Sequence, residues 1–498
     1  MKKQTLIKGS LILAAASIIA RFVGIFFRIP MDYLVGPQGM GIYYYPYPLY
    51  DTMMALSSVG LSVALSKLVS EKLESGEKLE AYRSFKIALL IFGIMGLGMS
   101  LIFALFAHQI AALFNWPAET VYALWGLSMA PVLVTAMSTL RGLFQGYQNT
   151  VPTGISMVIE QLGRVIIGLG LAWFLLKSTG NLGLAVGGAT FGATAGALLG
   201  LAYLGYTWYR NRASIRPAPG SGKVSMDLEA IVSRSRILLK WMIPITVCSL
   251  ISTLAATLDS ATLRLFLDGV MSPELIDTTN GALGRVTTII NVPIVISAAI
   301  TASLVPVISA CYVKEDIASA SRSIAKGFKL AMVLTIPAVA ALSFFPGQVI
   351  GLIYSSDLGA DIMRVYALTL VFSILSNLLL NISIVLNQTR IPMLSMGIGA
   401  VVKVLGNYLA CHVLGLGFVG AAWASVVMYA VIMTINIMAI RRIFPFRVDL
   451  SGVFVKPALS AALMVGACGA VYSAAVAALG AGRLSTLLLI LAGLGVYP

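Results

Sequence analysis

Two arginines occur inside the first apolar segment, in the stretch "ARFVGIFFRIP", as Arg21 and Arg28. A charged side chain at the centre of a bilayer costs at least about 2.5–3.5 kcal/mol, so such residues usually have a function. A separation of seven residues places both on one face of a helix, about 10 Å apart along its axis. Arginine keeps its charge and can bind two phosphate oxygens at once. Together with Arg285, near the start of a later apolar segment, they are predicted to bind a phosphorylated substrate in a membrane cavity.

A second set of polar residues at membrane depth is interpreted as cavity-lining or coupling residues. Its members are Asp51, Glu160, Arg164, Asp259, Arg264, Lys403 and Asn407. Glu160 and Arg164 are four residues apart, so a structural ion pair within one helix is favoured over a substrate role. Arg264 either lines the cavity or extends to the membrane surface, and Lys403 is predicted to be a counter-ion for Asp259. Basic residues outnumber acidic ones at this depth, which favours an anionic substrate over a cationic one.

The elements that must position these residues are membrane helices. Of the 498 residues, 59% are hydrophobic and only 11% are charged, a composition that excludes a soluble globular protein. Apolar segments of about 20 residues, each long enough to cross a bilayer, recur along the whole chain. We expect an all-α polytopic membrane protein with about fourteen transmembrane helices. Their predicted starts are near residues 8, 41, 85, 119, 151, 182, 239, 283, 328, 361, 391, 416, 453 and 484.

The two halves of the chain resemble each other. "QNTVPTGISMVIEQ" and "QTRIPMLSMGIGAV" begin at Gln148 and Gln388, 240 residues apart, and two helices that open with "FK" place Lys86 and Lys329 243 apart. This repeat predicts two pseudo-symmetric six-helix lobes, as in many secondary transporters. The expected parts are an N-terminal lobe (1–208), a cytoplasmic linker (209–238), a C-terminal lobe (239–440) and two further helices (441–498).

The basic residues predict the orientation of the chain. Of the 34 Lys and Arg residues, 25 lie in or beside alternate loops if the N-terminus is cytoplasmic, Arg141 among them. This fits the positive-inside rule, so the net charge of +15 is attributed to orientation and to contact with membrane lipids, with no nucleic-acid partner. The apolar N-terminus continues past Arg21 without a small-residue cleavage site, which favours a first membrane helix over a signal peptide.

Several kinds of chemistry find no support in the residues. The four cysteines and two histidines are isolated, so neither a metal site nor a disulfide framework is expected. "PAPGSGKV" lacks the first glycine and the final Ser or Thr of a phosphate-binding loop. The acidic residues outside the membrane are scattered, which disfavours a membrane enzyme, and no catalytic residue is assigned. We expect no cofactor; coupling to the membrane potential or to a monovalent cation stays open.

Four stretches resemble the oligosaccharide-lipid flippases of the multidrug/oligosaccharidyl-lipid/polysaccharide (MOP) exporter superfamily. They are "ARFVGIFFRIP", "VGLSVALSKLVSE", "LRGLFQGYQNTVPTGISMVIEQLGR" and "ATLDSATLRLFL". The groups that the chain resembles most are the MurJ-like lipid II flippases and the stage V sporulation protein B family. The resemblance implies a MATE-like pair of lobes, alternating access, cavity arginines at Arg21, Arg28 and Arg285, and a groove for a polyprenyl tail in helices 13 and 14. "DTMMALSS" departs from the pattern, because an arginine pair of the Gram-negative flippases is absent there.

The function expected from these observations is a secondary flippase in a bacterial cell membrane. Its substrate would be an undecaprenyl-pyrophosphate-linked saccharide, foremost the peptidoglycan precursor lipid II, used in cell-wall synthesis or sporulation. The alternatives are a flippase for another polysaccharide precursor, a cation-coupled multidrug exporter of the same superfamily, and a cell-wall enzyme or scaffold. Expected partners are the lipid-linked oligosaccharide, membrane lipids and cell-wall synthesis proteins. Five tyrosines in "GIYYYPYPLYD" are interpreted as an interfacial belt, with one or two facing the cavity.

Overall fold

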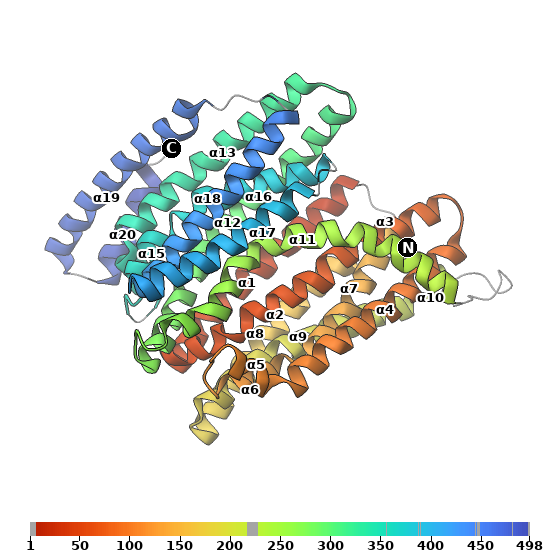
Figure 1. Ribbon diagram of the computed structural model, residues 1–498, viewed down its shortest axis with the longest axis horizontal. Coiled ribbons are helices and arrows are strands. Elements are labelled where there is room, and N and C mark those ends of the chain that lie inside the picture. The colour runs from red at the N-terminus through yellow and green to blue at the C-terminus, as the bar shows by residue number, and fades with distance from the viewer. Residues whose placement is uncertain are drawn as a thin grey trace. The chain divides into compact units, whose positions relative to one another are not determined.

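A computed structural model describes residues 6–216, 228–354, 356–386, 388, 390–443, 445, 449–480 and 482–496. Within these ranges the chain is helical, and the only extended pairing is an isolated bridge between Asp268 and Met271. The residues form two compact units, Met1–Ser260 and Ala261–Pro498, which are described separately. Figure 1 shows both units as bundles of long helices. The predicted all-α class is confirmed.

The first unit contains eleven of the labelled elements and most of a twelfth within its described residues. They are α1 (Leu6–Tyr44), α2 (Pro46–Met54), the π-helix η1 (Ala55–Val59), α3 (Gly60–Glu74), α4 (Lys78–Leu105), α5 (Ala107–Leu113), α6 (Thr120–Leu127), α7 (Ala130–Gly146), α8 (Val151–Thr179), α9 (Leu182–Arg210), α10 (Arg212–Ile215) and most of α11 (Leu228–Leu267). Two buried apolar clusters hold this unit together. One surrounds the end of α1 and the start of α2, and the other lies among α3, α4 and α7.

The second unit begins within the last residues of α11. Its further elements are α12 (Pro273–Val313), α13 (Ile317–Phe344), α14 (Pro346–Ile353), α15 (Ala360–Tyr366), α16 (Thr369–Val385), α17 (Arg390–Asn407), η2 (Tyr408–Val413), α18 (Gly417–Ile443), η3 (Ser451–Val455), α19 (Lys456–Leu479) and α20 (Arg483–Val496). The helix order repeats that of the first unit. Helices α4 and α13 both have 28 residues and start 239 positions apart, and α7 and α16 both have 17 residues and start 239 apart. The predicted duplication is confirmed.

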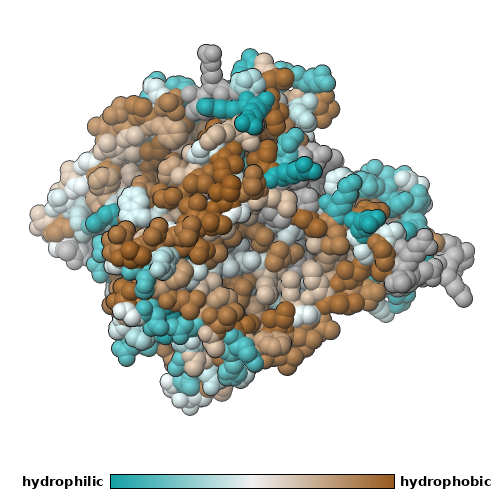
Figure 2. All heavy atoms as spheres, viewed as in Figure 1, coloured by the Kyte–Doolittle hydropathy of each residue, from teal (hydrophilic) through white to brown (hydrophobic). Residues whose placement is uncertain are grey.

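Helices form here because a bilayer offers no water to unpaired backbone groups, and a helix satisfies those groups within itself. Among the described residues, eight helices are long and apolar enough to span a membrane, or nine if the bent pair α15 and α16 counts as one. Large apolar side chains such as Ile166, Leu463 and Ile94 are more than 60% exposed, and brown hydrophobic side chains cover much of the surface seen in Figure 2. The chain is therefore a multi-pass membrane protein. The total of fourteen spans stays a prediction.

Several helices start earlier than the apolar pattern predicts. The expected starts near 151, 182, 361, 391, 416 and 484 lie within about one residue of α8, α9, α15, α17, α18 and α20, whereas those near 239 and 283 lie about ten residues inside α11 and α12. The first helix also continues past residue 41 to Tyr44, with a backbone break at Gly36 (φ 68°). The prediction counts only apolar residues, so it places the start of a helix at the edge of the hydrocarbon region. The helix itself begins earlier, because backbone hydrogen bonding continues through polar residues beyond that edge.

Most of α11 belongs to the first unit. The Lys67 ammonium lies 3.3 Å from the Trp241 ring centre, Arg234 forms an ion pair with Glu80, and the Thr52 and Thr257 hydroxyls are 2.6 Å apart. The first unit therefore ends at Ser260, within the predicted C-terminal lobe 239–440, and the linker 209–238 stays a prediction. Within that linker, residues 217–227 lie outside the described part of the structure.

Candidate functional site

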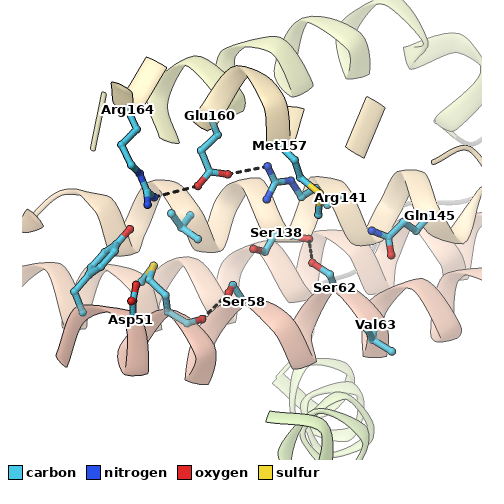
Figure 3. A pocket seen from close by; sticks show the side chains of 13 residues that line it. Asp51, Ser58, Ser62, Val63, Ser138, Arg141, Gln145, Met157, Glu160 and Arg164 are labelled. Atoms are coloured by element: carbon cyan, nitrogen blue, oxygen red, sulfur yellow. Dashed lines mark hydrogen bonds and ion pairs between the residues drawn. The ribbon is translucent and has the colours of Figure 1, made fainter. Parts of the chain in front are cut away.

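A polar cavity of about 330 Å³ lies inside the first unit. Three stretches form its walls: the α2–η1–α3 segment, α7 and α8 (Figure 3). Its lining residues are Tyr50, Asp51, Met54, Ser58, Ser62, Val63, Val134, Ser138, Arg141, Gln145, Met157, Glu160 and Arg164. The structure therefore brings together three of the predicted cavity residues, Asp51, Glu160 and Arg164. The outer surface of this unit is apolar.

A buried ion network forms one side of the cavity. Glu160 Oε2 accepts a hydrogen bond from Arg141 Nη2 at 2.9 Å, and Glu160 Oε1 lies 3.5 Å from Arg164 Nη2. Arg141 Nε also donates to Ser156 Oγ at 2.9 Å. The three charged side chains are only 11–14% exposed. The predicted Glu160–Arg164 pair is present, but Glu160 bridges two arginines rather than one.

Arg141 is a charged cavity residue that the sequence interpretation missed. It is counted there as a cytoplasmic loop charge, whereas the structure places it inside α7, 9% exposed and bonded to Glu160. Its partner lies 19 positions later on another helix, so no local spacing reveals the pair. The one available signal was the position of Arg141 in the "LRGLFQG" stretch that carries the family resemblance.

Glycine residues on α9 allow that helix to pack closely against α8, which carries Glu160 and Arg164 of the ion network. A Cβ atom added to Gly196 would lie 2.3 Å from the Glu160 carbonyl oxygen, and one added to Gly192 would lie 2.6 Å from the Arg164 carbonyl oxygen. Both distances are too short for any side chain. Gly192 and Gly196 therefore let the backbone of α9 touch that of α8 at the two residues whose side chains form the network, as small residues do at membrane helix interfaces.

On the opposite wall, the π-helix η1 interrupts the helix that carries Asp51. Single-turn π segments are frequent at functional sites because they re-aim the side chains that follow. The Ser58 hydroxyl donates to the Met54 carbonyl at 2.5 Å, and the Ser62 hydroxyl donates to the Ser138 carbonyl at 2.9 Å, which ties α3 to α7. Figure 3 shows Asp51, Ser58 and Ser62 along one wall and Glu160 and Arg164 along the other.

The five tyrosines of "GIYYYPYPLYD" do not form the interfacial belt that the sequence predicts. None forms an exposed interfacial belt: Tyr43, Tyr44, Tyr45, Tyr47 and Tyr50 are at most 8% exposed and belong to the core of the first unit. They are buried because they pack on one another, as in the stacked pair Tyr43 and Tyr47 with ring centres 4.7 Å apart. Tyr50 alone among the five lines the cavity.

The same tyrosines hold two arginines. The Arg28 guanidinium lies 5.5 Å from the Tyr44 ring centre and 5.8 Å from that of Tyr47, within cation–π range. The Tyr47 hydroxyl accepts a hydrogen bond from Arg164 Nη1 at 2.7 Å. Tyr47 therefore links Arg28 to the ion network. Arg21, on the same helix as Arg28, is exposed.

Arg285 belongs to the second unit, where it is fully buried in α12. Its Nη1 donates to Ser356 Oγ at 2.9 Å, and its guanidinium lies 5.0 Å from the Tyr354 ring centre. Arg28 and Arg285 thus share one kind of environment, a guanidinium beside tyrosine, in the two units. A phosphate site made jointly by Arg21, Arg28 and Arg285 stays a prediction.

The remaining predicted residues lie near the start of the second unit or in it. Arg264 forms an ion pair with Asp277, so it does not extend to the surface alone. Lys403 is fully buried and its Nζ donates to the Ala421 carbonyl at 2.8 Å and to Ser425 Oγ at 2.7 Å. Asn407 donates to Thr262 Oγ1 at 3.0 Å, and Asp259 is buried in α11. The role of Lys403 as counter-ion for Asp259 stays a prediction.

The second unit has its own cavity, which is apolar. It measures about 320 Å³ and lies among α13, α14, α19 and α20. Pro337, Ala341, Phe345, Met464 and Leu489 are among the side chains that line it. In the part of the chain that the structure describes, no three His, Cys, Asp or Glu residues are grouped as metal ligands would be.

Two families match the sequence. The polysaccharide biosynthesis protein family matches residues 6–312, and the MatE family matches residues 254–409. Among curated relatives, the stage V sporulation protein B of Bacillus subtilis is 26% identical over 95% of this chain and 90% of its own length. The lipid II flippase MurJ of the same organism is 26% identical over 81% of this chain and 76% of its own length.

Solved structures show the same fold. A lipid II flippase MurJ in an inward closed conformation superposes with a TM-score of 0.71 at 14% identity, covering 98% of this chain and 97% of that one. An inward-facing multidrug resistance MATE family transporter of the MOP superfamily gives a TM-score of 0.68 at 15% identity over 86% and 94%. These similar proteins are a flippase and a transporter, not enzymes. The chain belongs to the polysaccharide biosynthesis protein family and has the fold of the MOP superfamily.

Proposed function

We propose that this protein is a flippase that moves an undecaprenyl-pyrophosphate-linked saccharide from the inner to the outer leaflet by alternating access. The observation that carries the proposal is the polar cavity of the first unit, with four charged side chains inside a bundle whose surface is apolar. Such residues are costly in a membrane and usually mark a substrate pathway. The family match and the 26% identity to a lipid II flippase make the peptidoglycan precursor the first candidate.

The parts of such a lipid have different requirements. The pyrophosphate needs cations that stay charged, which Arg21, Arg28 and Arg285 supply. The polyprenyl tail needs an apolar surface, which the cavity among α13, α14, α19 and α20 offers in the region predicted to be a lipid-tail groove. The basic loops favour a cytoplasmic N-terminus, and the membrane potential or a monovalent cation would supply the energy.

A second candidate is a cation-coupled multidrug exporter. Two carboxylates, Asp51 and Glu160, line the cavity of the first unit, and the MatE family matches residues 254–409. A cationic drug needs carboxylates that are not already neutralised, however. Glu160 is held by two arginines, which leaves Asp51 as the one carboxylate of the cavity suited to this role.

Reconstitution in liposomes tests both candidates. We expect the purified protein to expose fluorescent lipid II from the inner leaflet to an impermeant quencher outside, and we expect protein-free liposomes not to do so. A neutral glycolipid with the same tail but no pyrophosphate should move slowly. Uptake of a lipophilic cation driven by a sodium or proton gradient, without lipid II movement, would instead support the exporter.

A further inference from the structure

We propose that the polar cavity of the first unit binds the uncharged saccharide part of the lipid headgroup, while the pyrophosphate stays outside it. This inference rests on the proposed function and assigns a specific part of the substrate to Asp51, Gln145 and the Arg141–Glu160–Arg164 network.

Both hydrogen-bond donors and hydrogen-bond acceptors line the cavity. Among the described residues, the half-buried Asp51 carboxylate and Gln145 amide form no side-chain hydrogen bond, and Asp51 interacts electrostatically with Arg28 and Arg164. A carboxylate needs donors, a guanidinium needs acceptors and an amide uses both. A polar group that loses its water without gaining a partner costs about 1–3 kcal/mol, so a ligand that fills the cavity has to pair with these groups. Sugar hydroxyls donate and accept, and can satisfy all three.

The charges of the cavity exclude an ion as the preferred ligand. Asp51 and Glu160 together balance Arg141 and Arg164, so the lining is neutral overall. A pyrophosphate would face the Asp51 carboxylate, and the arginines that could attract it are already bonded to Glu160. A cationic ligand would face two guanidinium groups. A neutral polyhydroxyl group meets neither repulsion.

The size and the apolar surfaces of the cavity also fit a saccharide. A volume of about 330 Å³ lies at the lower end of the range for small-molecule pockets, so it holds a sugar unit or two but not a whole lipid headgroup. Tyr50, Met54, Val63, Val134 and Met157 supply apolar patches between the polar groups. Sugar rings present such alternation themselves, with C–H faces between their hydroxyls.

Photocrosslinking in liposomes tests the assignment. The probe is an undecaprenyl-pyrophosphate disaccharide with a diazirine on the sugar, and the comparison lipid has its diazirine at the end of the tail. After illumination and proteolysis, we expect the sugar probe to label peptides covering 51–63, 134–145 and 157–164. The tail probe should label other segments. Unmodified lipid should compete with the sugar probe, and undecaprenyl pyrophosphate without sugar should compete poorly.

Two variants and one control sharpen the result. Gln145→Leu and the isosteric Asp51→Asn should each lower sugar labelling about three- to tenfold, the loss of one or two hydrogen bonds. Gln109→Leu, on the exposed surface of α5, should leave it unchanged. The inference would be overturned if the sugar probe labelled only peptides outside these three, or if labelling were unaltered in both cavity variants. The cavity would then hold water and not the saccharide. Absence of lipid movement in the unmodified protein would instead refute the proposed function, independently of where the label lies.

Discussion

Glu160 is the residue whose loss should cost the first unit the most stability. It is 9% exposed and its two carboxylate oxygens face Arg141 at 2.9 Å and Arg164 at 3.5 Å. In Glu160→Leu both guanidinium groups stay buried without their counter-charge. Removing one partner of a buried ion pair costs about 3–5 kcal/mol. We expect a loss in this range, more than a hundredfold in the folding equilibrium.

The same reasoning gives an opposite expectation for the triple variant R141M/E160L/R164M. Replacing a whole buried ion network by apolar side chains of similar volume is often neutral or stabilising. The triple variant should therefore unfold within about 1 kcal/mol of the unmodified protein or later, because no uncompensated charge remains. Transport should nevertheless be lost, since the cavity wall no longer offers charged or hydrogen-bonding groups at three positions.

Denaturation in mixed micelles with increasing sodium dodecyl sulfate measures these differences, with helical circular dichroism as the signal. The liposome assay measures transport on the same samples. The reasoning is refuted if Glu160→Leu unfolds like the unmodified protein, or if the triple variant is as unstable as the single one. Full transport by a stable triple variant would show that the network has no part in the substrate pathway.

Three further predictions concern packing, binding and orientation. Gly196→Val should cost about 1–3 kcal/mol or more, because its Cβ would lie 2.3 Å from the Glu160 carbonyl; in the same micelle assay, Gly205→Ala on the open side of α9 should be neutral. Arg28→Ala should fold normally but lose liposome transport of the pyrophosphate-linked lipid, and Arg28→Lys should recover it partly because the planar fork is missing. Ser75→Cys and Ser272→Cys, without native cysteines, should react with an impermeant thiol reagent from opposite sides; labelling from one side would contradict the orientation.

Features that depend on local sequence could be predicted. Membrane helices follow from apolar runs, the duplication follows from repeated spacing, and the Glu160–Arg164 pair follows from an i,i+4 separation on one helix. The helices and the ion pair are each set within about thirty residues of chain, and the duplication follows from comparing two such segments about 240 residues apart. The fold class needed no more than that.

Features that depend on which helices touch could not be predicted in this way. Arg141 meets Glu160 across two helices, 19 positions apart, and apolar counting alone makes Arg141 look like a loop residue. The tyrosines of "GIYYYPYPLYD" have the composition of an interfacial belt, and only their mutual packing shows that they are buried. The place of α11 in the first unit could not be predicted either, because its contacts with α3 and α4 join residues more than 150 positions apart in the chain.

The charge balance of the cavity suggests how a flippase can keep a polar interior without substrate. Each isolated charge in a membrane is expensive, but Arg141, Glu160 and Arg164 neutralise one another to within one charge, and Asp51 completes the balance. A neutral lining is inexpensive when empty, and it suits the uncharged saccharide that we propose as its ligand. Arg28, which we propose to bind the pyrophosphate, lies outside this network beside the Tyr44 and Tyr47 rings. An aromatic face stabilises a guanidinium by cation–π attraction, which lowers the cost of keeping this charge at membrane depth.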